Sequence, residues 1–143
     1  KPAMEIYPLT EVTDEVVKAF ERLFPQLTSL PAPTRSALEE MTASPACRIF
    51  MARAEGQIAG TATLACYRTP TGLHAWIEDV VVDEAFRRQG IGEALTRALI
   101  DEARRVGADS LSLTSRPARE AANRLYQQLG FVRWETNLYH FPL

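Results

Sequence analysis

Two arginines and two glycines follow the valines Val80, Val81 and Val82, in an arrangement that can bind an anion. The valines predict a buried strand, and apolar residues at helical spacing after the second glycine predict a helix. Glycines let the backbone approach an oxyanion, and the N–H groups and dipole of a helix N-terminus attract negative charge. Arginines add charged donors. We therefore predict a phosphate cradle made of Arg87, Arg88, Gln89, Gly90, Ile91 and Gly92.

The glycine pair alone does not identify the ligand. A Walker loop needs Gly-Lys-Ser/Thr, but Gly92 is followed by Glu93 and Ala94. A dinucleotide fingerprint needs a third glycine where this chain has Leu95. With both motifs excluded, two interpretations are left: the loop binds a pyrophosphate on another scaffold, or the glycines only make a tight turn before a helix.

Glu78 is a carboxylate in an otherwise apolar run that predicts a strand over residues 74–82. A half-buried carboxylate there can have a raised pKa and take a proton from an ammonium group, directly or through water. Asp79 points to the opposite face of an ideal strand, although a bulge would change that direction. Either residue can instead bind the ammonium group or simply face solvent.

Cys47 and Cys66 are the only cysteines, so the sequence has neither a disulfide framework nor clustered zinc ligands. We expect no metal. Two reduced cysteines, in a chain that opens without a signal peptide, lead us to expect a cytoplasmic protein. No apolar run approaches the ~18 residues of a membrane-spanning helix, so we expect no membrane partner.

The segments that must position these residues alternate between the two secondary-structure periods. Thr13 and Thr34 are predicted N-caps, Gly107 and Gly130 predicted helix ends, and Pro117 a predicted first-turn proline. We predict helices over residues 13–24, 34–41, 91–106 and 117–129, and strands over 4–7, 47–54, 57–67, 74–82, 110–114, 131–134 and 138–141.

This order predicts one mixed α/β domain over residues 1–143. The three middle strands form an antiparallel meander, and the strand–helix–strand unit that follows implies a parallel crossover. A chain of 143 residues with 46% hydrophobic and 24% charged residues fits a single globular domain.

The net charge of −2 conceals an uneven distribution. Residues 1–86 carry seven basic and twelve acidic side chains, whereas residues 87–133 carry nine basic and five acidic ones. The basic half can meet an anionic ligand and the acidic half a cationic one, or both can be ordinary solvated faces. The near-neutral balance argues against a nucleic-acid partner.

Three segments together resemble the GNAT superfamily of N-acetyltransferases. Arg87–Gly92 matches the family's Arg/Gln-x-x-Gly-x-Gly/Ala signature, and Ile77–Val82 looks like its fourth strand. Asn123–Phe131 is similar to its Asn-x-x-x-Tyr-x-x-x-Gly-Phe stretch. The resemblance implies a mixed sheet with splayed central strands, flanked by about four helices.

The resemblance also implies that acetyl-coenzyme A is the cosubstrate and that its acetyl group passes directly to an amine in a ternary complex. It assigns the coenzyme to Val80–Val82 and Arg87–Gly92, with backbone groups near Val80 and Val82 holding the pantetheine. Tyr126 would protonate the leaving thiolate. Asn123, one turn earlier, can hydrogen-bond the pantetheine or the surroundings of Tyr126, or can point to solvent. Tyr126 can instead be a core aromatic residue, and the chain a non-catalytic acyl-CoA sensor on the same fold.

The acceptor implied is a primary amine of a small molecule or peptide. Its pocket is expected between the two N-terminal helices, residues 27–34 and the chain end near Tyr139. Glu78 is the candidate general base, with Asp79 or a water chain as alternatives. A homodimer is possible through the closing strands.

Overall fold

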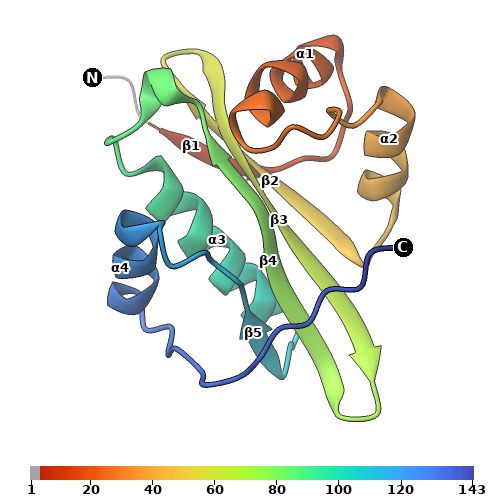
Figure 1. Cartoon of the computed structure of the whole chain (residues 1–143). Helices are drawn as coiled ribbons and strands as arrows, with labels where there is room; N and C mark the ends of the chain where they lie inside the picture. The colour runs from red at the N-terminus through yellow and green to blue at the C-terminus, as the bar shows by residue number, and fades with distance from the viewer. Residues whose placement is uncertain (1–3) are drawn as a thin grey trace. The chain divides into compact units, whose positions relative to one another are not determined.

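The computed structural model describes residues 4–143, and the chain divides into two compact units, one up to Leu113 and one from Thr114 onward. The first unit contains one sheet in the order β1-β2-β3-β4-β5 (Figure 1). Its strands are β1 (Glu5–Pro8), β2 (Cys47–Ala54), β3 (Gln57–Thr69), β4 (Gly72–Val82) and β5 (Ser110–Ser112). The helices of the chain are α1 (Asp14–Leu23), η1 (Phe24–Gln26), α2 (Arg35–Ala43), η2 (Glu84–Phe86), α3 (Ile91–Arg105) and, in the second unit, α4 (Glu120–Gln128).

The sheet is mixed, as predicted. Strands β1 to β4 pair antiparallel with their neighbours, and β5 pairs parallel with β4 after the crossover through α3. The parallel pairing covers only His74–Trp76 of β4. From Ile77 to Val82, the edge of β4 that faces away from β3 has no strand partner in residues 4–143. This gap is the predicted splay of the central strands.

Helices α1 and α2 begin where the predicted N-caps place them. The Thr13 hydroxyl accepts from the backbone N–H of Val16 at 3.2 Å, and the Thr34 hydroxyl accepts from that of Ala37 at 3.1 Å. Each threonine therefore satisfies one of the unpaired N–H groups of a first turn.

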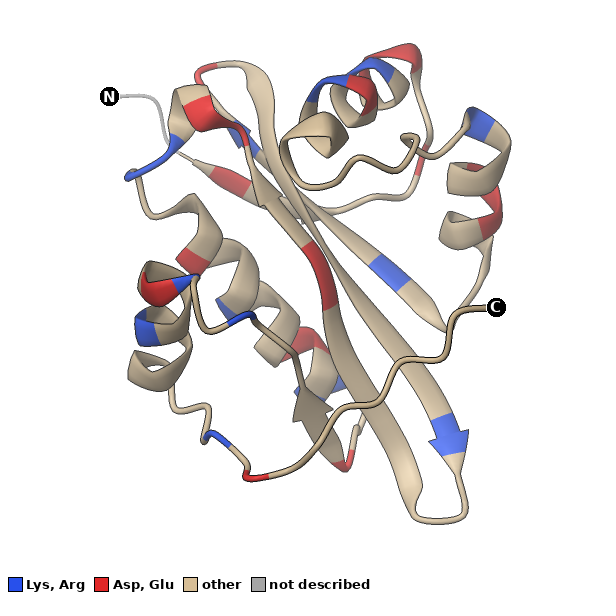
Figure 2. Cartoon of the chain, in the orientation of Figure 1, with Lys and Arg blue, Asp and Glu red and all other residues tan. Residues whose placement is uncertain are grey.

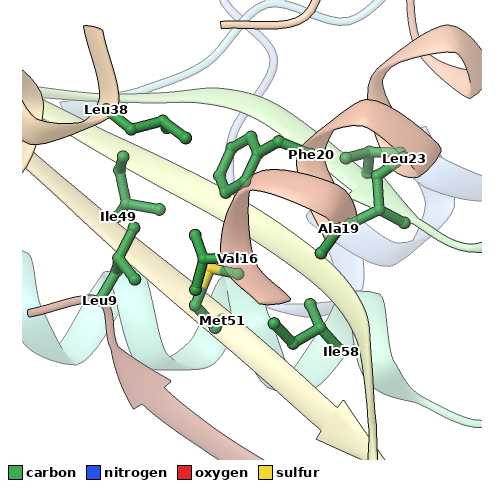
Figure 3. Close-up of a cluster of buried hydrophobic side chains, with 10 residues drawn as sticks. Leu9, Val16, Ala19, Phe20, Leu23, Leu38, Ile49, Met51 and Ile58 are labelled. Carbon is green, nitrogen blue, oxygen red and sulfur yellow. The ribbon is translucent and has the colours of Figure 1, made fainter. Parts of the chain in front are cut away.

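The main core lies between the sheet and the helices α1 and α2 (Figure 3). Phe20 and Leu23 of α1, Leu38 of α2 and Met51 of β2 are at most 2% exposed. Strand β3 also packs against α3, since Gly60 lies close to side chains of that helix. The two-sided packing holds β3 and β4 rigidly in the middle of the first unit.

The last segment of the chain corrects two predictions. Helix α4 begins at Glu120, not at Pro117, because residues 116–119 form a turn in which the Arg119 N–H donates to the Arg116 carbonyl at 3.0 Å. The closing strands predicted over 131–134 and 138–141 are wrong, because none of these residues is in a strand. Their alternating apolar pattern finds no ladder partner in the described chain, and side chains such as Trp134 and Tyr139 are exposed.

Two further expectations concern the chain as a whole. Among the described residues, no helix is both long and apolar enough to cross a membrane. A single domain over residues 1–143 stays a prediction.

Gly60 tests the packing of β3 against its neighbours. A Cβ there would lie 2.9 Å from the Val81 carbonyl oxygen and 3.3 Å from Leu95 Cδ1. We expect Gly60→Ala to lower the free energy of unfolding by about 1–3 kcal/mol, measured by urea denaturation. Gly92→Ala is the control. The nearest atom to its new Cβ would be Val82 Cγ2, at an ordinary contact distance of 3.8 Å, and alanine favours a helix. Equal losses in both variants would contradict the tight packing.

Candidate active site

The predicted cradle is the loop between β4 and α3, and its backbone conformation needs glycine. Gly90 is the N-cap residue of α3 with φ +80°, and no side chain caps the helix there. Arg88 is also left-handed, at φ +65°. The left-handed region favours glycine over residues with a Cβ, so the loop keeps an energetically costly shape that leaves the helix end open.

The N-terminus of α3 offers free donors. The first backbone N–H of the helix with a backbone acceptor is that of Ala94, which donates to the Gly90 carbonyl at 3.0 Å. Within residues 4–143, the N–H groups of Ile91, Gly92 and Glu93 have no protein acceptor. Free N–H groups at a helix start are the donors that bind phosphate. The loop therefore fits a pyrophosphate.

The side chains of the cradle divide by exposure. Arg87, Arg88 and Gln89 are exposed, whereas Ile91 is 1% exposed and packs inward, so that only its backbone can face a ligand. The Arg87 Nε also donates to the Val82 carbonyl at 3.3 Å. Positive charge therefore gathers at the loop, seen in blue before α3 in Figure 2.

The unpaired edge of β4 leads into this loop. The Asp83 N–H donates to the Ala59 carbonyl of β3 at 2.8 Å. Because hydrogen-bonded residues alternate along an antiparallel ladder, the backbone groups of Val82 point to the other edge, where Arg87 reaches the Val82 carbonyl. Val81 bonds toward β3, and its side chain is in the core. Of the three predicted valines, Val80 and Val82 thus border the open edge, and Val81 does not.

Glu78 and Asp79 lie at a β-bulge. Thr63 pairs with Glu78 and Thr61 with Val81, so two residues of β4 stand opposite one residue of β3. Asp79 takes up the bulge with φ +51°. In an unbroken strand Glu78 and Val81 would face opposite sides. The bulge puts both on the side of the sheet that α1 and α2 cover.

The negative charge of Asp79 acts on Glu78. Glu78 is exposed, not half-buried as predicted. Partial desolvation of its carboxyl group, and then the negative charge of Asp79, raises the pKa of Glu78 above its ordinary value. Neither residue has an ion-pair partner within the described chain. The acidic stretch is the red band in the middle of β4 in Figure 2. A carboxylate with a raised pKa and no cation beside it suits a general base or an ammonium-binding group.

Tyr126 and Asn123 are both on α4, in the second unit. Tyr126 is 8% exposed, its ring meets Phe131 edge-on at 5.8 Å, and burial raises its pKa. The Asn123 Nδ2 donates to the Arg116 carbonyl at 3.0 Å and so stabilises the turn before the helix. Asn123 therefore has a structural contact that the sequence did not predict.

Other parts of the molecule offer less chemistry. A pocket of about 370 Å³ lies between the end of β1, the start of β2 and Glu102 of α3, and contains none of the predicted site residues. Burial raises the pKa of both Cys47 and Cys66. No group of metal-ligating side chains is present in residues 4–143. Sequence reasoning missed Asp83, a buried carboxylate between β4 and the cradle that side chains of α1 and η1 contact.

The comparisons with known proteins show the family of the chain. The model of the acetyltransferase (GNAT) family matches residues 11–131. The chain belongs to the GNAT family, and the predicted fold class is confirmed.

Individual relatives differ in what they acetylate. Mycothiol acetyltransferase of Renibacterium salmoninarum is 35% identical over 118 residues, which are 80% of this chain and 35% of that protein. The ribosomal protein bS18 alanine N-acetyltransferase of Escherichia coli strain K12 is 42% identical over 68 residues, 48% of this chain and 46% of that protein. This chain therefore spans less than half the length of either relative.

A solved structure shares the fold along nearly the whole chain. The crystal structure of a Trypanosoma brucei acetyltransferase superimposes with a TM-score of 0.79 at 25% identity, and covers 98% of this chain and 100% of that one.

The raised pKa of Glu78 tests the geometry of the bulge. We expect its carboxyl to titrate above the ordinary value of 4.5, measured by carbon NMR. Asp79→Asn should lower this pKa only in part, because burial is the larger cause. Glu40→Gln, which removes an exposed carboxylate from α2, is the control and should change nothing. A Glu78 titration that is unaltered by Asp79→Asn would show that the two charges do not interact.

Proposed function

We propose that the protein is an acetyl-coenzyme A-dependent N-acetyltransferase that transfers an acetyl group directly to a primary amine of a small molecule or peptide. The observation that carries the proposal is the open N-terminus of α3 beside the unpaired edge of β4. The helix N–H groups and Arg87 and Arg88 would bind the pyrophosphate. The backbone of Val80 and Val82 would pair with the pantetheine amides as a strand does.

The acceptor would approach from the face of the sheet that carries Glu78, on the side of α1 and α2. A protonated amine is attracted to Glu78 and Asp79, which have no cationic partner in the described structure. Glu78 then takes a proton from the ammonium group, directly or through water. Because only the ionised carboxylate can do this, the rate should rise with pH through the raised pKa of Glu78.

In the transfer, the amine nitrogen forms a bond to the acetyl carbon and the carbon–sulfur bond breaks. The sulfur leaves as a thiolate and takes a proton from Tyr126, whose raised pKa keeps the phenol protonated at neutral pH. The phenolate regains a proton from the nitrogen through solvent, so that one proton is released overall. Asn123 would hydrogen-bond the pantetheine through its amide oxygen, which has no partner within residues 4–143.

Direct transfer fits the state of the two cysteines. A covalent acyl-enzyme would need a thiolate, but the raised pKa of Cys47 and of Cys66 keeps both as thiols at neutral pH. Reduced cysteines also fit the cytoplasm, which we propose as the location. A homodimer stays a prediction. The closing strands that were expected to pair across it are not formed in residues 131–143.

A substitution at Gly90 tests the cradle, because it changes both the charge and the backbone conformation of the loop. Gly90→Asp places a carboxylate beside the phosphates and a side chain at φ +80°, so CoA binding should weaken at least about 100-fold by calorimetry. Gly56→Asp is the matched control: Gly56 has φ +76°, equally open surroundings and a place in the β2–β3 turn. The Gly56→Asp variant should have a backbone strain similar to that of Gly90→Asp, but its CoA affinity should equal that of the wild type. Unchanged affinity in Gly90→Asp would exclude the cradle.

Tyr126→Phe tests the acid. With an amine that the wild type acetylates in a mass-spectrometric panel, we expect kcat to fall by about 10²–10⁴-fold with little change in the KM for acetyl-CoA. The ring packing on Phe131 is kept, so the melting temperature serves as the control for folding. A wild-type rate in the variant would remove Tyr126 from the mechanism. CoA binding without turnover on any amine would instead indicate an acyl-CoA sensor.

A further inference from the structure

Asp83 is a buried carboxylate at the point where β4 ends and the loop toward the cradle begins. Its side chain is 10% exposed. A carboxylate so withdrawn from water is stable only where charged or polar donors surround it. The identity of these donors shows what the residue holds together.

The donors come from the loop itself and from the two neighbouring helices α1 and η1. From the loop itself, the Ala85 N–H donates to Asp83 Oδ1 at 3.1 Å, so that Asp83 caps η2. From α1, the Arg22 Nε donates to Asp83 Oδ2 at 3.1 Å, and from η1 the Gln26 amide donates to Oδ1 at 3.4 Å. Together they hold the pKa of Asp83 below its ordinary value against the opposing effect of burial.

Arg22 and Gln26 each make a second contact that fixes the same turn. Another guanidinium nitrogen of Arg22 donates to the Ile58 carbonyl, next to the residue of β3 that pairs with Asp83. The Gln26 side-chain oxygen accepts from the Glu84 N–H at 2.9 Å. In the described chain, these two residues supply all the polar side-chain contacts that other elements make to residues 83–90.

The turn that they hold sets the path of the chain into the cradle. Residues 84–86 form the single turn η2, and Arg87 follows at once in an extended conformation. A change in the orientation of η2 would therefore move Arg87 and the left-handed Arg88. Gln26 is also the last residue before 27–34, the loop that we expect to line the acceptor pocket.

We propose that Asp83, held by Arg22 and Gln26, is a positioning residue for the coenzyme, so that the end of α1 controls coenzyme affinity without touching the coenzyme. We refer to these three residues as the cradle clamp. The inference rests on the proposed function, because it takes the loop after β4 as the pyrophosphate site.

The test measures CoA dissociation constants by calorimetry for the wild type, Asp83→Asn and Gln26→Leu. We expect about tenfold weaker binding in both variants, since each loses a hydrogen bond to a charged group or to the turn. Arg22→Lys keeps the charge but not the forked geometry, so its affinity should lie between those of the wild type and Arg22→Leu. Gln26→Leu keeps the test decisive if the buried-charge variants fold poorly.

A second ligand shows whether the effect lies at the phosphate end of the coenzyme site. The nucleotide 3′-phosphoadenosine 5′-diphosphate carries the pyrophosphate of CoA without pantetheine. If the clamp shapes the cradle, its affinity should fall by the same factor as that of CoA. An unchanged affinity for this nucleotide, with weaker CoA binding, would place the effect elsewhere and overturn the proposal.

The Glu15–Arg53 ion pair provides the matched control. It also joins α1 to the sheet, with 2.8 Å between Glu15 Oε2 and an Arg53 terminal nitrogen, but its strand partner is β2. Glu15→Gln should leave the CoA affinity unchanged. A tenfold loss there too would show that any loosening of α1 weakens binding, and would overturn a specific role for the clamp.

The remaining outcomes distinguish the two proposals. If the wild type binds CoA and the clamp variants bind it equally well, the positioning role is wrong and the proposed function stands. If the wild type itself fails to bind CoA, both are wrong.

Discussion

In the part of the chain that the structure describes, strand β4 leaves half of one edge unpaired. The arrangement of the proposed site depends on that edge. Its parallel neighbour β5 contributes only three residues, so pairing stops at Trp76. An exposed edge normally invites unwanted pairing with other chains. Here the same edge ends at the N-terminus of α3, where free N–H groups and arginine side chains adjoin it. A ligand with amides at one end and phosphates at the other is satisfied by both features together.

The bulge at Asp79 connects this edge to the face of the sheet that α1 and α2 cover. Without the extra residue, the strand could not turn Val81 into the core and keep Glu78 on the same face. The left-handed backbone of Asp79 is less favourable than an extended one, but aspartate tolerates it better than most residues. The pairing of β4 with β3 and the core beneath α1 and α2 stabilise this unfavourable conformation. One irregular residue therefore puts a carboxylate on the strand whose edge would hold the coenzyme in the proposed function.

Local signals in the sequence were sufficient for most of the fold. Thr13 and Thr34 predicted their helices because a capping hydroxyl bonds to a donor three residues away. The bulge was foreseen only as a possibility, because Asp79 is not glycine and pairing register is a property of two strands. The clamp could not be predicted, since Arg22 and Asp83 are 61 residues apart. The closing strands were wrong for a related reason: alternation along residues 131–141 shows which residues suit a strand, but not whether an edge is available to pair with.

The uneven charge along the sequence gains meaning once the ion pairs are known. In the acidic first half, Asp14, Glu15 and Asp83 are paired with arginines of that same half. These pairs fix α1 and α2 in place, and the acidic surplus is left to the other carboxylates. On α3, three arginines pair with carboxylates of the same helix. Glu78 and Asp79 at the bulge, and Arg87 and Arg88 in the cradle, have no such partners within residues 4–143. Unpaired charge attracts ligands more strongly than paired charge. The bulge inside β4 and the loop that follows the strand therefore carry a local preference, negative at the bulge and positive at the cradle.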